Sequence, residues 1–226
     1  MSGDLAFDFA TLPQAQRYKL LVGLVVPRPI ALVTSIGPGG IVNAAPFSFF
    51  NVFSEEPPLV VLGLQSKADG SIKDTPANIR EIGTFVINLV DEALADRMNI
   101  CAIDFPRAMS EIEVAGLTLS PSVAVEVPRI ADAPVALECK HYMTLEVSRE
   151  RRLCIGQVVY LHAREGILDP KNLRVILEAY RPVARLFGNH YAQLGETFLL
   201  TRQSYAEWEA SGGVNGARSA ARREPS

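Results

Sequence analysis

The stretch IALVTSIGPGGIVNAAPF, residues 30–47, decides the fold because it predicts two strands joined by a tight turn. Its first seven residues are mostly aliphatic or β-branched, a composition that favours extended backbone. The GPGG that follows, residues 37–40, is typical of a turn, and a second extended run begins directly after it. A phosphate-binding loop would lead into a helix instead, so we interpret residues 30–47 as an antiparallel hairpin.

The rest of the chain adds further strands and a few helices to this hairpin. Apolar, β-rich runs predict strands over residues 58–64, 84–90, 134–148 and 152–168. Caps and proline positions predict helices over residues 11–24, 75–83 and 91–102, with Thr75 and Asp91 as N-caps, and residues 168–180 predict a turn and a helix. Because strands and helices do not alternate regularly, we expect a closed or nearly closed antiparallel barrel with peripheral helices.

Composition and charge restrict the class of protein. The 226 residues are 48% hydrophobic and 21% charged, which is ordinary for a globular chain, and a formal net charge of -3 argues against nucleic acid as a partner. No apolar run is long enough to cross a bilayer, and the N-terminus lacks a secretory signal pattern. Three widely spaced cysteines predict neither disulfides nor a zinc site. We therefore expect a reduced, cytoplasmic protein without a membrane partner or a metal; a metal site assembled from distant residues is the less favoured alternative.

The segment NAAPFSFFN, residues 43–51, mixes aromatic side chains with amides and a hydroxyl. A ligand-binding wall has this composition, because pockets are mostly apolar with a few placed polar groups. Backbone N–H groups and Ser48 would then face the polar edge of a flat ligand. A barrel strand that ends in an irregular loop explains the same residues, and from this segment alone that alternative is slightly favoured.

A second segment, KDTPANI, residues 73–79, places Lys73, Asp74 and Thr75 at the start of an expected helix. The first N–H groups of a helix attract anions, and an adjacent lysine suits a phosphate. A capped helix beside a solvated lysine is the alternative. The combination with the aromatic, hydroxyl-rich segment changes the balance, because together they suit a flat ring that carries a phosphate.

Taken together, these segments resemble the flavin reductase-like family, which has the FMN-binding split-barrel fold. The resemblance rests on the order and spacing of VPRPIALVTS, NAAPFSFFNVFSEEPP, DGSIKDTPANI, TFVINLV, EVAGLTLSPS, PVALEC and RLFGNHY, and it covers about residues 18–191. It implies a mainly β, six-stranded antiparallel split β-barrel with peripheral α-helices, assembled as a homodimer with FMN near the subunit interface. It also implies hydride transfer from NADH or NADPH to flavin, a reaction that requires no catalytic side chain and no metal.

The resemblance assigns a candidate flavin site residue by residue. Thr34 and Ser35 are expected near the flavin, although hydroxyls at a strand end could equally cap the strand. Lys73, Asp74 and Thr75 are expected around the phosphate, and Arg28 is a weaker candidate. The wall along the isoalloxazine ring and the ribityl chain would consist of Ala45, Pro46, Phe47, Ser48, Phe49, Phe50 and Asn51.

Two positions depart from the family pattern. The late motif usually has two glycines, and Phe187 takes the place of the first. The resemblance therefore does not predict the loop over the flavin face, nor the substrate. The acidic motif after the cysteine-containing helix usually ends in Glu-Phe. Here it is Glu111-Ile112, which we interpret as a core substitution.

The expected organisation is an N-terminal extension (1–17), a flavin reductase-like FMN-binding domain (18–205) and a disordered tail (206–226). The leading hypothesis is an NAD(P)H:flavin oxidoreductase that acts on small molecules. One form of this hypothesis is the reductase component that supplies a monooxygenase partner. One alternative holds FMN and reduces another acceptor, such as a metal chelate, a quinone, a corrinoid or an electron-transfer protein. Another alternative binds flavin without NAD(P)H turnover.

Overall fold

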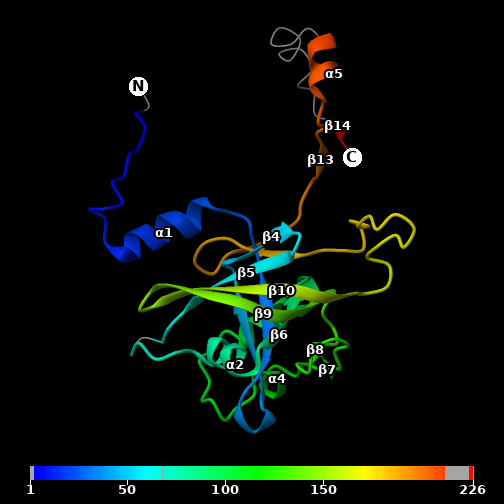
Figure 1. Cartoon of the computed structure of the whole chain (residues 1–226). Coiled ribbons are helices and arrows are strands. Elements are labelled where there is room, and N and C mark those ends of the chain that lie inside the picture. Colours follow the sequence, from blue (N-terminus) through cyan, green and yellow to red (C-terminus); the bar gives the residue numbers. More distant parts are fainter. Residues whose placement is uncertain (1–2, 68, 212–223, 226) are drawn as a thin grey trace. The chain divides into compact units, whose positions relative to one another are not determined.

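The computed structural model describes residues 3–67, 69–211 and 224–225. The chain divides into two units, Met1–Gln193 and Leu194–Ser226 (Figure 1). The second unit contains the helix α5 (Tyr205–Ala210) and the strand β13 (Phe198–Leu199), which pairs with β14 (Glu224–Pro225). The expected start of the tail at residue 206 thus falls within α5, and residues 212–223 and 226 of that tail lie outside the described residues.

The first unit contains the barrel and its surrounding helices. The helices are α1 (Gln14–Leu24), α2 (Asp74–Ile82), α3 (Ala95–Ile100) and α4 (Glu111–Val114), with the short 3-10 helices η1 (Pro38–Gly40) and η2 (Glu92–Leu94). The strands are β1 (Arg28–Pro29), β2 (Ala31–Ile36), β3 (Val42–Phe47), β4 (Phe50–Glu55), β5 (Pro58–Gln65), β6 (Thr84–Leu89), β7 (Leu119–Ser120), β8 (Arg129–Ile130), β9 (Val135–Ser148), β10 (Arg151–Ala163), β11 (Val183–Arg185) and β12 (Tyr191–Gln193). Among the described residues, no helix is both long and apolar enough to cross a membrane.

Seven strands of the described chain form one antiparallel sheet in the order β3-β2-β6-β9-β10-β5-β4. The expected hairpin over residues 30–47 is present as β2 and β3, with Ala31 opposite Phe47 and Ser35 opposite Asn43. Figure 1 shows β9 and β10 running side by side across the sheet, as their pairing requires. The sheet has one strand more than the six that the resemblance implies.

The sheet curls on itself because its two edge strands are neighbours in the chain. β3 ends at Phe47 and β4 begins at Phe50, so only two residues connect the opposite ends of the strand order. Three residue steps span at most about 11 Å, which forces the two edges together at this point. No hydrogen-bonded ladder joins these edges in the described part of the chain. This arrangement is a split barrel, so the expected mainly β, antiparallel split-barrel fold is confirmed.

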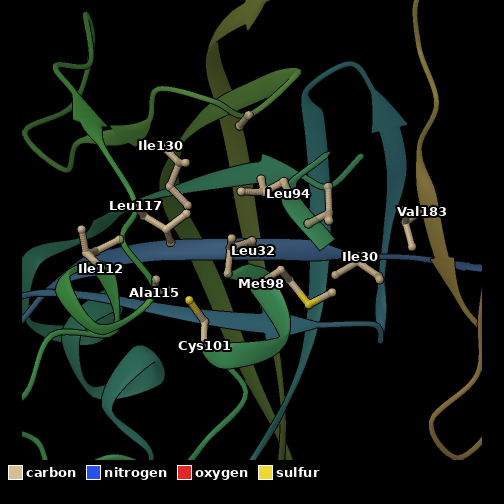
Figure 2. Packing of buried hydrophobic residues seen from close by; sticks show 13 residues of the cluster. Ile30, Leu32, Leu94, Met98, Cys101, Ile112, Ala115, Leu117, Ile130 and Val183 are labelled. Carbon is tan, nitrogen blue, oxygen red and sulfur yellow. The ribbon is translucent and has the colours of Figure 1, made fainter. Parts of the chain in front are cut away.

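β2 is buried on both faces. Alternate residues of a strand point to opposite sides, so its neighbouring residues pack in two different clusters. Ala31 and Val33 pack in the barrel interior together with Phe85 of β6. Leu32 packs in an outer cluster against Met98 of α3 (Figure 2). Burial on both sides explains the nearly continuous apolar sequence of β2. The outer cluster also holds α3 and α4 against the barrel, next to the edge strand β3.

The turn expected within residues 168–180 is present at residues 170–172, but the helix expected with it is absent, because side chains there bond to nearby backbone groups instead. The Asp169 carboxylate accepts from the N–H of Lys171 at 2.9 Å, and Asn172 Oδ1 accepts from the N–H of Arg174 at 2.9 Å. Such local bonds compete with helical hydrogen bonds. Leu173 also has a φ of 58°, in the left-handed region that interrupts a helix.

Two expected N-caps have different outcomes. Asp91 caps η2 as predicted, since its carboxylate accepts from the N–H of Leu94 at 3.2 Å. Thr75 is not the cap of α2, because that helix begins one residue earlier, at Asp74, with Lys73 in the cap position. Thr75 is buried, and its hydroxyl bonds to β3 rather than to its own helix.

Candidate functional site

A pocket of about 590 Å³ opens between β3, the start of α2 and the segment that follows α3. β3 is an edge strand of the barrel, so it pairs with another strand on one side only. A proline has no N–H group to donate, and it is tolerated in such an edge strand. The pocket joins the two segments that the sequence singles out, residues 43–51 and 73–79. The sequence-predicted residues that line it are Ala45, Pro46, Phe47, Lys73, Asp74 and Thr75.

A hydrogen-bond network holds the walls of this pocket together. The Thr75 hydroxyl donates to Asn43 Oδ1 at 3.1 Å, and Asn43 Nδ2 donates to the Glu111 carboxylate at 2.9 Å. The same carboxylate oxygen accepts from the backbone N–H of Ala44 at 3.1 Å. The network therefore connects α2, β3 and α4, and it sets the position of the helix start relative to the edge strand.

Ion pairs distribute charge around the mouth of the pocket. Lys73 Nζ lies 3.1 Å from the carboxylate of Asp104. Asp74 lies between two cations, with Lys67 Nζ 3.6 Å from one carboxylate oxygen and Arg107 Nε 3.2 Å from the other. Partly exposed pairs of this kind contribute only about 0–1 kcal/mol to stability. A more strongly charged ligand can therefore take the place of one partner.

Cys101 contributes a thiol to the apolar side of the pocket. Figure 2 shows it in the outer cluster together with Met98 and Ala115. Burial raises the pKa of this thiol to about 12, and the negative charge of Glu111 adds to the rise. The thiol is therefore protonated at neutral pH and is not available as a thiolate nucleophile.

A smaller pocket of about 260 Å³ adjoins the first, because Pro46, Phe47 and Ala102 line both. Two further sequence-predicted residues, Arg28 and Ser48, line this second pocket. The two adjoining pockets extend from the start of α2, along β3, to β1. We call this pair of pockets the β3 hollow.

Arg28 is buried, and its guanidinium bonds to backbone carbonyls. Nη1 donates to the carbonyls of Val22 at 2.5 Å and Val25 at 2.9 Å, and Nη2 donates to the carbonyl of Leu186. Burial lowers the pKa of Arg28 from its ordinary value, and Tyr18 opposes this shift. Arg28 thus fastens the end of α1 and the loop after β11 to β1, which makes it a structural tie at the edge of the hollow.

Thr34 and Ser35 are neighbours in β2 and face opposite sides of it, and neither lines the β3 hollow. The Thr34 hydroxyl is buried and donates to the carbonyl of Pro128 at 2.7 Å. Ser35 Oγ accepts from Nδ2 of Asn78 in α2 at 3.1 Å. Ser35 is therefore placed behind the wall of the hollow, whereas Thr34 belongs to the outer face of the strand.

The remaining predicted residues, Phe49, Phe50 and Asn51, also lie outside the hollow. Phe50 is buried in the barrel interior, and Asn51 is exposed, with its side chain accepting from the N–H of Val52 at 2.8 Å. Phe49 packs over Gly63, where an added Cβ would lie only 2.8 Å from the Cβ of Phe49. This close approach explains a glycine in the middle of β5.

Sequence reasoning missed several parts of the hollow. Residues 65–67, at the end of β5, and residues 102–106, after α3, line the first pocket. Arg185 and Tyr191 line the second, with the guanidinium carbon 4.5 Å from the centroid of the tyrosine ring. The segment AIDFP, residues 102–106, directly follows the cysteine-containing helix and is apolar apart from Asp104, and it is the signal that could have pointed to the missing wall. Glu111 is singled out in the sequence only because it belongs to the Glu111-Ile112 motif, which differs from the family pattern.

Comparison with known proteins agrees with this architecture. The sequence model of the flavin reductase like domain matches residues 23–195, which is most of the chain. The chain belongs to the flavin reductase-like family. Membership in this flavin-binding family makes the protein an oxidoreductase of the flavin type.

Relatives of the flavin reductase-like protein include two solved structures that are similar in both fold and sequence. 2-Nitrobenzoate 2-nitroreductase NbaA from Pseudomonas fluorescens is 41% identical, with a TM-score of 0.82 over 89% of this chain and 98% of its own. Nitrilotriacetate monooxygenase component B from Bacillus cereus is 36% identical, with a TM-score of 0.83 over 88% of this chain and 100% of its own. The uncharacterized protein YwrF from Bacillus subtilis is 40% identical over 203 residues, which are 88% of this chain and 98% of YwrF.

Proposed function

We propose that this flavin reductase-like protein binds FMN in the β3 hollow and transfers a hydride from NADH or NADPH to the flavin. The observation that carries the proposal is that two adjoining pockets bring a cationic helix start and an apolar wall together. A ring system that carries a phosphate on a short chain needs these two environments at opposite ends of its site. The first pocket, of about 590 Å³, also falls within the range of about 300–1,000 Å³ that is usual for small-molecule sites.

At the phosphate end, Lys73 and Lys67 would supply charge and α2 would supply N–H groups. The N–H groups of Asp74 and Thr75 have no carbonyl partner within α2, because they belong to its first turn. The start of a helix also carries a partial positive charge that favours an anion. The carboxylate of Asp104 now pairs with Lys73, and a phosphate can replace it because the pair is exposed and weak.

At the ring end, Pro46 and Phe47 would offer an apolar surface between the two pockets. Ser48 is a polar lining residue available to the edge of a ring, whereas the hydroxyl of Tyr191 accepts from Arg185 and donates to Asn99 Oδ1 at 3.4 Å. When flavin is bound, the cofactor supplies the two-electron chemistry, and the protein's share is to bind it, orient it and exclude competing reactions. Arg28 would act as a positioning residue, because it holds α1 and Leu186 beside this end.

We extend the proposal to a homodimer, because the first unit exposes many apolar side chains on neighbouring strands. The sheet order places β9, β10, β5 and β4 side by side. Exposed apolar residues on β4, β9 and β10 are Val52, Phe53, Tyr142, Met143, Leu145, Val147, Leu153, Tyr160 and Leu161. Large exposed apolar surfaces usually mark an interaction site, and an apolar edge strand such as β4 is usually covered. We infer that a second copy of the chain covers these strands.

A reductase of another acceptor is the second candidate function. NbaA, which is 41% identical to this chain, is named for the reduction of 2-nitrobenzoate, and this favours an aromatic acceptor. The similarity to nitrilotriacetate monooxygenase component B favours instead a protein that supplies reduced flavin to a separate oxygenase.

Steady-state oxidation of NADH and NADPH by the purified, FMN-loaded protein tests the proposed function. We expect nucleotide consumption in the presence of an acceptor. Acceleration by free FMN would indicate that flavin is released as a product. Acceleration by 2-nitrobenzoate, but not by free FMN, would favour the second candidate. FMN-loaded protein that oxidises neither nucleotide with any of these acceptors would contradict hydride transfer and leave a flavin-binding protein.

A further inference from the structure

A third pocket, of about 790 Å³, lies beside the β3 hollow. It is formed by α1, by the loop that contains Phe187, and by the ends of β5 and β10. Tyr18, Val22 and Gly188 line both this pocket and the second pocket of the hollow, and Gln65 lines both this pocket and the first. We call it the α1 pocket. A molecule bound in it would be a direct neighbour of a ligand in the β3 hollow.

One wall of the α1 pocket follows from the helical period. Ala15, Tyr18 and Val22 are spaced by three and four residues, so α1 presents them on one face. Phe187 adds a second aromatic ring from the late loop, where it is 49% exposed and lies against the ring of His190 with 4.8 Å between centroids. The lining is mainly apolar and includes two aromatic side chains. Such a surface suits a flat, apolar ring.

All charged residues of this lining are cationic. Lys19 contributes from α1 and Arg151 from the start of β10, and no carboxylate is among the described lining residues. Neither cation forms a salt bridge within the described ranges. The Arg151 guanidinium donates instead to the backbone carbonyl of Glu150 at 3.2 Å. The positive charge at this pocket is therefore not neutralised by the protein, and it favours a ligand with a negative charge.

We propose that the α1 pocket binds a small aromatic carboxylate, with its ring against Tyr18 and Phe187 and its negative charge toward Arg151 or Lys19. A dinucleotide is a poorer match, because its many polar groups would need more partners than a mainly apolar lining supplies. The use of this carboxylate as the electron acceptor rests on the proposed function, since the pocket adjoins the hollow assigned to flavin. Its binding does not.

Equilibrium dialysis of the full chain, with and without FMN, tests this assignment with 2-naphthoate and its neutral counterpart 2-naphthylmethanol. At least one of Arg151→Gln and Lys19→Gln should lower 2-naphthoate affinity about tenfold, with 2-naphthylmethanol changed by less than about twofold. Phe187→Gly should lower the affinity for both. Lys171→Gln is the matched control, because it removes the same charge from an exposed loop outside the pocket, and it should change neither. Thermal unfolding of each variant verifies that it folds.

Equal affinity of the wild-type protein for the acid and the alcohol would overturn the assignment. Unchanged 2-naphthoate binding in both charge variants would do the same. A larger loss of NADH affinity than of 2-naphthoate affinity in these variants would assign the pocket to the reductant instead. FMN titration separates this proposal from the proposed function: if the wild type binds 2-naphthoate in a charge-dependent way but binds no FMN, only the proposed function fails.

Discussion

Thr75 donates its hydroxyl to Asn43 Oδ1 across 3.1 Å, and this bond joins the first turn of α2 to the edge strand β3. The two residues belong to segments that are ambiguous when each is considered alone. Because Thr75 bonds to β3 rather than capping its own helix, the helix start and the apolar wall become two sides of one pocket. The proposed phosphate site therefore depends on the position of α2 relative to β3.

Replacing Lys73 with alanine tests the phosphate end of the hollow. The substitution removes the ammonium charge but leaves the N–H groups of α2, so only part of the phosphate binding is lost. A hydrogen bond to a charged group contributes about 1.5–3 kcal/mol, so FMN affinity should fall by about one to two orders of magnitude. Riboflavin, which lacks the phosphate, should bind almost unchanged. Fluorescence-quenching titrations with both ligands measure the difference.

Asp104→Asn is the control for Lys73→Ala, because it removes the carboxylate that now pairs with Lys73. FMN affinity should not fall in this variant. If FMN and riboflavin weaken together in Lys73→Ala, the lysine acts through the structure of its loop. If neither weakens, the phosphate site is elsewhere.

FMN should stabilise the folded protein by mass action. At a free concentration of about one hundred times its dissociation constant, a ligand that binds only the native state adds about 2.7 kcal/mol to the free energy of unfolding. Urea unfolding at increasing FMN concentrations measures this increase. A colourless protein whose unfolding does not respond to FMN would rule out the cofactor.

Phe187→Gly should change turnover more than FMN affinity. Phe187 lines the α1 pocket and neither pocket of the β3 hollow. Removing its ring should open this side and either raise the rate of NADH oxidation or broaden the range of acceptors. The measurements are kcat/KM with NADH and several acceptors, and the Kd for FMN. Equal losses in turnover and in FMN affinity would identify Phe187 as a packing residue.

Light scattering should show a dimer at micromolar concentration, and Phe53→Asp should convert it to a monomer. Phe53 is an exposed residue of the edge strand β4, and a charge buried there without a partner opposes association. Leu5→Asp is the control, since Leu5 is also exposed but precedes the helices and strands of the barrel. A monomeric wild-type protein that binds FMN tightly would contradict the proposed dimer.

Glu138 should make stability depend on pH. Its fully buried carboxylate accepts from His162 Nε2 at 2.6 Å and from the backbone N–H groups of Val123, Ala124 and Val125. Burial alone would raise the pKa of Glu138, but the hydrogen bonds from His162, Val123 and Ala124 outweigh it and lower the pKa from 4.5. A lowered folded pKa means that the unfolded chain binds this proton more tightly. The stabilisation is therefore complete above about pH 4.5 and is lost as the pH falls through the lowered value.

Glu138→Gln measures this contribution, because it keeps the size of the side chain and removes its charge. At pH 7 the variant should be less stable by about 3 kcal/mol, since it leaves buried donors without a charged acceptor. The difference from wild type should shrink as the pH falls below about 4.5 in urea unfolding experiments. A difference that stays constant with pH would show that the charge of Glu138 is not responsible.

Local patterns predicted six of the seven strands of the large described sheet, and the exception is the edge strand β4. The hairpin over residues 30–47 and the long strands β9 and β10 follow from β-rich runs and turn residues that lie within a few positions of each other. The helix expected with a turn within residues 168–180 is absent for a reason that is also local. Side-chain bonds of Asp169 and Asn172 outweigh a helical pattern of apolar residues there.

Resemblance to a family indicated the segments of the proposed site, but the direction of each side chain depends on the closed barrel. Lys73 and Phe47 line the hollow, whereas Phe50 points into the barrel and Thr34 bonds on the outer face of β2. Adjacent residues of a strand face opposite sides, and which side faces the hollow is decided by how the whole sheet curls.

Contacts between distant segments complete the site, and the residues themselves carry no local signal for them. The bond between Thr75 and Asn43, the pairing of Lys73 with Asp104, and the apolar wall after α3 all join parts of the chain that are separated by tens of residues. Such partners are set by the path of the chain, which closes the barrel by connecting its two edge strands through only two residues. Strand patterns and turn chemistry are therefore legible in the sequence, whereas the walls of the hollow exist only once the barrel has closed.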